Sequence, residues 1–142
     1  MPVILDTNVV SLLRENHSPM SARLVQKMRL LPSSDIWTTV VSYQEQLKGW
    51  LAEINRPGND RQLLKAYAAL QNTLITFTRL SVAPFDESAL EIYRDLKTQR
   101  LGVGTHDLRI ASIALARGAV VVTQNRRDFE RVSGLLVEDW TV

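Results

Sequence analysis

Five short runs of apolar and β-branched residues predict buried strands along the chain. The run at 119–123, with three consecutive valines, gives the strongest signal and is typical of a strand covered on both faces of a parallel sheet. The runs at 80–82 and 136–137 are weaker, so the pattern predicts four to five strands. The five runs are residues 3–5, 36–39, 80–82, 119–123 and 136–137.

Between these runs, apolar residues recur every three or four positions, which predicts amphipathic helices. Ser18 and Pro19 begin one of them, residues 55–58 end another, and Gly118 closes the last in the position that favours glycine. Strands that alternate with helices predict right-handed crossovers and a mainly parallel sheet covered on both faces. One helix is expected shortly after residue 5. The other expected helices span about residues 19–31, 39–55, 63–77, 87–96 and 105–117.

Composition limits the chain to one ordinary globular domain. It has 142 residues, 45% of them hydrophobic, with no repeat or low-complexity segment, so we expect a single domain over residues 1–142. It has no cysteine, which excludes disulfides and thiolate metal sites. The start lacks a signal-peptide pattern, and no apolar run approaches the roughly 20 residues of a membrane span. We therefore expect a cytoplasmic protein without membrane contact.

The net charge says little about partners, but the type of cation adds something. Against 15 acidic residues stand 17 basic ones, a formal charge of +2, which does not by itself indicate a nucleic-acid binder. Thirteen of the 17 are arginine, whose planar guanidinium suits phosphate groups. Most surface arginines are nevertheless simply solvated.

Acidic side chains occur where predicted strands give way to loops or helices. Asp6 follows the first strand, Glu45 lies shortly after the second, Asp107 opens the helix that Gly118 closes, and Asp128 follows the valine strand. Because ligands of parallel sheets bind at the carboxyl ends of the strands, we expect these residues to meet at one edge. Clustered carboxylates repel one another, and a hard divalent cation such as Mg²⁺ or Mn²⁺ offsets that repulsion. Metal-assisted phosphodiester hydrolysis is the chemistry that such a site supports.

Each acidic residue also has a purely structural interpretation. Asp6 can cap the following helix, and Glu45 completes a capping-box pattern with Ser42. Asp107 can complement the helix dipole, and Asp128 can cap a short turn. His106 and His17 are expected to be ordinary surface or loop residues, because neither has a partner histidine. Only the joint pattern favours a functional site.

Four segments carry these acidic residues in characteristic surroundings. They are residues 3–8, Glu45 with Leu47 and Gly49, residues 104–114, and residues 122–129 continuing to 138–140. In this order they resemble the motifs of PIN-domain ribonucleases of the VapC type, the toxins of bacterial toxin–antitoxin pairs. The resemblance covers essentially the whole chain.

The resemblance implies a PIN-like three-layer α/β/α sandwich and Mg²⁺- or Mn²⁺-dependent cleavage of RNA. It also implies homodimers and inhibition by a small VapB-like antitoxin. Catalytic roles fall to four acids, three of which are also the expected metal ligands, and three polar residues would orient waters or ligands behind them. The catalytic set is Asp6, Glu45, Asp107 and Asp128, the metal ligands are Asp6, Glu45 and Asp107, and the supporting set is Asn8, Thr123 and Asn125.

One position departs from the family pattern. Many members have an aspartate where this chain has Asn125, so the fourth acid is either lost or supplied by Asp128. An amide can bind a cation through its carbonyl oxygen but brings no charge. A catalytically weakened PIN module that acts by binding RNA or protein is therefore the main alternative.

A receiver-like phosphoacceptor domain is a more distant alternative, because it also gathers acids at strand ends. That fold expects a late lysine, whereas all four lysines precede the valine strand. Separately, one helix carries large apolar side chains that form part of the core or a groove for an antitoxin helix. These side chains are Tyr43, Leu47, Trp50, Leu51 and Ile54.

Overall fold

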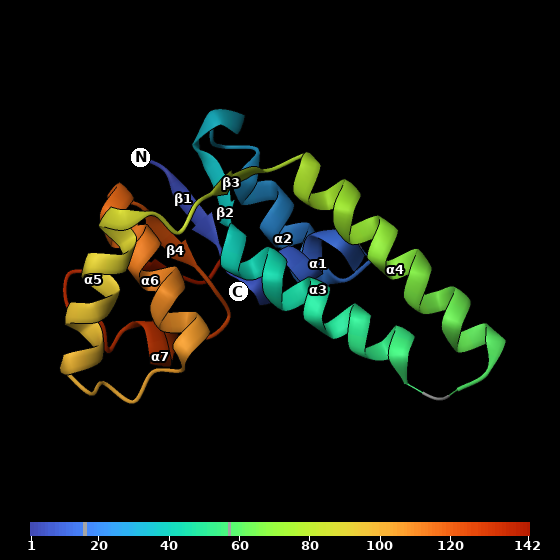
Figure 1. The fold of residues 1–142 in the computed structure, drawn as a ribbon. Helices are drawn as coiled ribbons and strands as arrows, with labels where there is room; N and C mark the ends of the chain where they lie inside the picture. The colour runs from blue at the N-terminus through green and yellow to red at the C-terminus, as the bar shows by residue number, and fades with distance from the viewer. Residues whose placement is uncertain (16, 57) are drawn as a thin grey trace.

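The chain folds around a parallel five-stranded sheet (Figure 1). The structure, a computed structural model, describes residues 1–15, 17–56 and 58–142. The strand order is β3-β2-β1-β4-β5, so β1 is the central strand. Strands β2 and β3 lie on one side of β1, and β4 and β5 lie on the other. Every paired neighbour is parallel, as the alternation of strands and helices predicts. The strands are β1 (Val3–Leu5), β2 (Ile36–Thr39), β3 (Ser81–Ala83), β4 (Val120–Val122) and β5 (Val137–Glu138).

Helices cover both faces of the sheet and give the expected three-layer α/β/α sandwich (Figure 1). Successive residues of β1 face opposite layers, so Ile4 packs with one set of helices while Val3 and Leu5 pack with the other. The first layer contains α5 and α6, and the second contains α1, α2 and part of α4. The helices are α1 (Thr7–Glu15), α2 (Pro19–Met28), α3 (Val40–Asn55), α4 (Asp60–Thr78), α5 (Glu87–Thr98), α6 (Thr105–Arg117) and α7 (Arg126–Phe129).

Helices α3 and α4 form a long antiparallel pair that extends beyond the sheet (Figure 1). The first turns of α3 lie against the strand ends, where Val41 and Ser42 are buried. Farther out, Trp50 Nε1 donates a hydrogen bond to Thr73 Oγ1 across the pair, at 2.9 Å. Pro57, within the segment predicted to end α3, lies outside the described residues.

The predicted elements agree with the structure except at their ends. Helix α6 and its cap are as predicted, because Gly118 adopts a left-handed conformation with φ of 62° that favours glycine. The valine strand is shorter than predicted, β5 begins one residue later, and the four-residue α7 was not predicted as a helix. In the described residues, no helix is both long and apolar enough to span a bilayer.

Candidate active site

The four acidic residues come together where the strands end. Asp6 directly follows β1, Glu45 lies in the second turn of α3, Asp107 in the first turn of α6, and Asp128 in α7. Burial, followed by repulsion from the other three carboxylates, raises the pKa of Asp107 to about 6, an effect that the neighbouring imidazole of His106 partly opposes. The convergence predicted from the sequence is therefore present.

Asp6 is the most constrained member of the cluster. Its side chain is buried, and both carboxylate oxygens are engaged: Thr123 Oγ1 donates to Oδ2 at 2.7 Å, and the Thr7 backbone N–H donates to Oδ1 at 2.8 Å. Burial raises the pKa of Asp6, whereas these two hydrogen bonds lower it. A helix-capping side chain usually accepts from the second or third helical N–H. Asp6 instead accepts from the first helical N–H, that of Thr7. Its other carboxylate oxygen accepts from Thr123, which directly follows β4.

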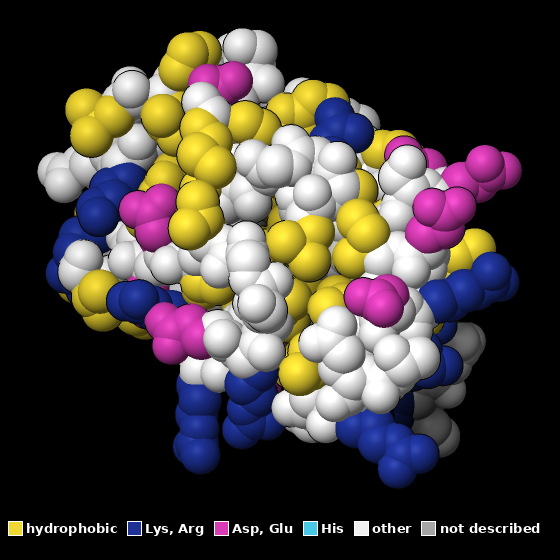
Figure 2. Space-filling view, turned by 90° about the vertical axis from the view of Figure 1, so that its left-hand side faces the viewer, with side chains coloured by type: hydrophobic (Ala, Val, Ile, Leu, Met, Phe, Trp, Pro, Cys, Tyr) yellow, Lys and Arg dark blue, Asp and Glu magenta, His cyan; other side chains and the backbone are white. Residues whose placement is uncertain are grey.

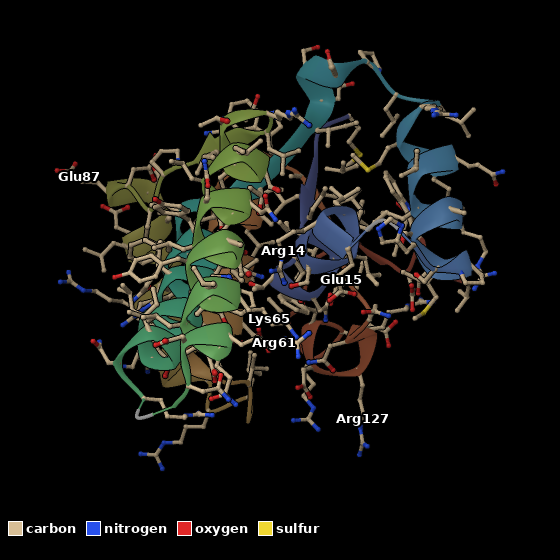
Figure 3. The ribbon with its side chains drawn as sticks, turned by 90° about the vertical axis from the view of Figure 1, so that its right-hand side faces the viewer. Arg14, Glu15, Arg61, Lys65, Glu87 and Arg127 are labelled. Atoms are coloured by element: carbon tan, nitrogen blue, oxygen red, sulfur yellow. The ribbon has the colours of Figure 1, made fainter. Side chains whose placement is uncertain are left out.

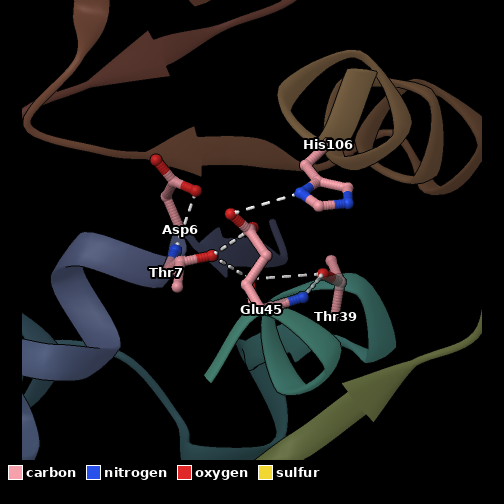
Figure 4. A network of polar contacts seen from close by, with 6 residues as sticks. Asp6, Thr7, Thr39, Glu45 and His106 are labelled. Carbon is pink, nitrogen blue, oxygen red and sulfur yellow. Dashed lines mark hydrogen bonds and ion pairs between the residues drawn. The ribbon is translucent and has the colours of Figure 1, made fainter. Parts of the chain in front are cut away.

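Glu45 belongs to this site and not to a capping box. Helix α3 begins at Val40, and its N-cap is Thr39, whose hydroxyl accepts from the Ser42 N–H. Glu45 instead receives a hydrogen bond from Thr7 Oγ1 at 2.8 Å, and its second oxygen lies 3.6 Å from His106 Nδ1 (Figure 4). The structural interpretation of Glu45 was therefore wrong.

Asn125, where many family members have an aspartate, contacts Asp128. The Asn125 amide nitrogen donates to Asp128 Oδ2 at 2.9 Å, while Asp128 Oδ1 lies 3.9 Å from an Arg131 guanidinium nitrogen. Asp128 contributes to the raised pKa of Asp107, so its charge acts on the cluster. A fourth carboxylate is thus present near the site, and Asn125 holds it.

The supporting residues take three different positions. Thr123 contacts Asp6 as described, and its hydroxyl also accepts from the Asn125 backbone N–H at 2.9 Å. Asn8 is farther from the acids, because its side-chain oxygen accepts from the Gln124 N–H at 3.3 Å and so joins α1 to the loop after β4. That contact stabilises the loop, which in turn places Thr123.

Sequence reasoning missed two residues at this site. His106 was expected to be an ordinary histidine, but the structure places it against Glu45; its position next to Asp107 was the available signal. Thr7 contacts both Asp6 and Glu45, and its place between Asp6 and Asn8 was the only hint. His17 is exposed, as expected.

The acidic side chains of the site offer carboxylate oxygens, the type of ligand that a hard divalent cation prefers. Burial together with repulsion among these carboxylates raises the pKa of Asp107. A bound cation would offset that repulsion. As they stand, no three acidic or histidine side chains among the described residues are arranged to hold an ion together. Binding would therefore require side-chain movements from the contacts seen here.

Comparison with known proteins identifies relatives along the whole chain. The family model of the PIN domain matches residues 3–135. The chain is 29% identical over 144 aligned positions to Ribonuclease VapC1 of Haemophilus influenzae strain R2866, covering 99% of both. It is 41% identical to the tRNA(fMet)-specific endonuclease VapC of Shigella flexneri over 68 positions, 45% of this chain and 52% of that one. A 2.2 Å structure of VapBC-1 from nontypeable Haemophilus influenzae superposes with a TM-score of 0.77 at 25% identity, covering 100% of both chains.

Proposed function

This chain belongs to the PIN-domain family, and from that premise we propose that it is a Mg²⁺- or Mn²⁺-dependent endoribonuclease, the toxin of a VapBC-type pair. The observation that supports the reaction most directly is the position of four acidic residues at one sheet edge, where burial and then repulsion from the other three carboxylates raise the pKa of Asp107 to about 6. The family match also removes the receiver-like alternative. We further propose that residues 1–142 form one PIN domain that acts in the cytoplasm.

In the proposed reaction, Asp6, Asp107 and Glu45 hold the cation. When bound, the ion stabilises negative charge on the phosphate and lowers the pKa of a bound water. Thr123 keeps Asp6 oriented, and Asn125 does the same for Asp128. These two contacts orient the carboxylates of Asp6 and Asp128 before the substrate arrives.

Glu45 is suited to accept the proton of the attacking water, in addition to or instead of binding the ion. One of its oxygens accepts from Thr7, and the other points toward His106 (Figure 4). Water attacks phosphorus, the bond to the 3′ oxygen breaks, Glu45 takes the water proton, and the 3′ oxygen is protonated from solvent. The products are a 5′-phosphate and a 3′-hydroxyl.

Basic side chains at the lower edge of the molecule support a polyanionic substrate. Lys and Arg side chains project from the lower edge of the surface seen in Figure 2. Arg127 points down from α7, and Arg61 and Lys65 lie on the side of α4 that faces α1 (Figure 3). Because positive charge at this edge attracts RNA phosphates, it would bring the backbone toward the acidic residues.

We propose a VapB-like antitoxin and a second copy of the chain as protein partners. The relative solved as VapBC-1 supports the antitoxin. The apolar helix face predicted to bind it borders a groove of about 600 Å³, to which α3 contributes Tyr43 and Leu47 and α4 contributes Tyr67 and Leu74. We keep this groove as the predicted antitoxin contact, to be checked by hydrogen exchange of α3 with and without a cognate partner.

One experiment tests the proposed activity. Purified protein and its Asp6→Ala variant are incubated with a mixed RNA pool in Mg²⁺, Mn²⁺ or EDTA, and the cut ends are mapped. We expect metal-dependent cuts with 5′-phosphate ends by the wild type and no cuts by a variant that circular dichroism shows to be folded. Binding without turnover in millimolar Mn²⁺ would favour the weakened module, and undiminished cutting by Asp6→Ala would refute the assignment.

A further inference from the structure

We propose that Thr7 is a positioning residue that fixes the carboxylates of Asp6 and Glu45 relative to each other. The inference rests on the proposed function, because it gives Thr7 a place in that same site. Thr7 is the first residue of α1 and is separated from the end of the central strand by Asp6 alone. It contacts one acid through its backbone and another through its side chain.

The two contacts join residues that are far apart in the sequence. The Thr7 N–H donates to Asp6 Oδ1 and the Thr7 hydroxyl lies 2.8 Å from Glu45 Oε1, so one residue links β1 to α3 through two carboxylates. Hydrogen bonds to the ionised form stabilise that form. Thr7 therefore holds two like charges close together, an arrangement that their mutual repulsion opposes.

Buried neighbours restrict the direction of the Thr7 hydroxyl. Its oxygen also lies 2.9 Å from Ser42 Oγ, and Ser42 is fully buried at the start of α3. The backbone of Ser42 is in turn fixed by the Thr39 hydroxyl, which accepts from its N–H at 3.1 Å. Because this chain of contacts ends in the N-cap of α3, the position of the helix determines where Glu45 is held.

A second contact between the same helices separates positioning from simple packing. One turn along α1, Ser11 Oγ accepts from Gln46 Nε2 at 2.7 Å and donates to the Thr7 carbonyl oxygen at 3.1 Å. Within the part of the chain that the structure describes, Ser11 makes no hydrogen bond to an acidic side chain. Ser11 and Thr7 thus both join α1 to α3 through a hydroxyl. Only Thr7 does so through a carboxylate of the site.

The test compares three variants by Mn²⁺ titration calorimetry without RNA and by steady-state cleavage of one RNA. Thr7→Val keeps the side-chain shape and the backbone N–H but removes the hydroxyl. Thr7→Ser restores the hydroxyl, and Ser11→Ala is the matched control for helix packing. If Thr7→Val does not fold, Thr7→Ala removes the same donor without adding a methyl group in its place.

We expect Thr7→Val to weaken Mn²⁺ affinity and lower kcat by about 10- to 100-fold, the usual effect of removing an outer contact of a metal ligand. KM should stay within about twofold, because Thr7 holds Glu45 and not the RNA. Thr7→Ser should recover most of both losses, and Ser11→Ala should match the wild type in both.

Two results would overturn the proposal for Thr7. One is wild-type Mn²⁺ affinity and kcat in Thr7→Val, and the other is an equal loss in Ser11→Ala, which would show that only helix packing matters. A wild-type protein that binds Mn²⁺ but cuts no RNA would instead contradict the proposed function. The calorimetric comparison would still decide the role of Thr7 in that case.

Discussion

The two ends of helix α3 serve different regions of the molecule. Its first turns close the acidic edge, where Ser42 is buried and Glu45 is held by Thr7. Its outer turns pair with α4 and leave large apolar side chains in solvent, among them Leu51 and, on α4, Leu64 and Tyr67. The first end of α3 thus lies among carboxylates that repel one another, whereas the outer end exposes apolar side chains to solvent. Substitutions at the first end should remove chemistry without unfolding the protein, and those at the second should change association without affecting chemistry.

The largest effect is expected at Asp107. Asp107→Asn should lower RNA cleavage by at least about 100-fold, because it removes the negative charge of one of the proposed ligands of the cation. The same change should raise the melting temperature of the metal-free protein at pH 7, since it relieves repulsion from Asp6, Glu45 and Asp128. Initial rates and thermal melts in EDTA measure both effects. Full activity in an Asp107→Asn variant with a raised melting temperature would show that Asp107 has no part in the reaction.

A smaller loss of activity is expected at Asn125. Asn125→Ala frees Asp128 from its amide donor and should reduce cleavage about tenfold. Because Asn125 acts through Asp128, the double variant Asn125→Ala/Asp128→Ala should be no less active than Asp128→Ala alone. Additive losses in this cycle would mean that Asn125 has a separate role.

The acidic edge should also make stability depend on pH. The pKa of Asp107 is about 6 in the folded protein against 3.8 for the free side chain, and that of Asp6 is raised as well. The folded state therefore binds protons more tightly, so the free energy of unfolding in EDTA should fall as pH rises from about 4 to about 6. Urea titrations across this range measure the slope. Asp107→Asn should flatten it, and an unchanged slope would contradict the assigned pKa.

The outer turns should show the smallest effect on catalysis. Leu64 is 72% exposed, so Leu64→Ser should change the free energy of unfolding by no more than about 0.5 kcal/mol and leave cleavage unaltered. If this surface binds a partner, the variant should shift the association measured by sedimentation. A loss of cleavage in the monomeric protein would show that the two regions are not independent.

Much of this fold could be predicted because its signals are local. The helix Thr105–Arg117 and its glycine cap follow from apolar spacing and one residue with a left-handed backbone. Helix α7 escaped prediction because four residues are too few to show a helical period. The strand ends then brought Asp6, Glu45, Asp107 and Asp128 together, as the topology of a parallel sheet requires.

The finer contacts of the site could not be predicted, because they depend on how helices cross. The Ser42 and Glu45 pattern fits a capping box, but Thr39 provides the cap and frees Glu45 to reach Thr7. His106 approaches Glu45 only because α6 begins beside α3. Sequence spacing along one helix contains no information about such pairs.

Mn²⁺ binding to the metal-free protein shows whether the carboxylates at the acidic edge share one cation. Calorimetric titrations of the wild type, Asp107→Asn and Leu64→Ser would be compared under identical conditions. We expect Asp107→Asn to bind Mn²⁺ at least about tenfold more weakly than the wild type, and Leu64→Ser to bind it as tightly as the wild type. Equal affinity in the wild type and Asp107→Asn would contradict a metal site at this edge of the sheet.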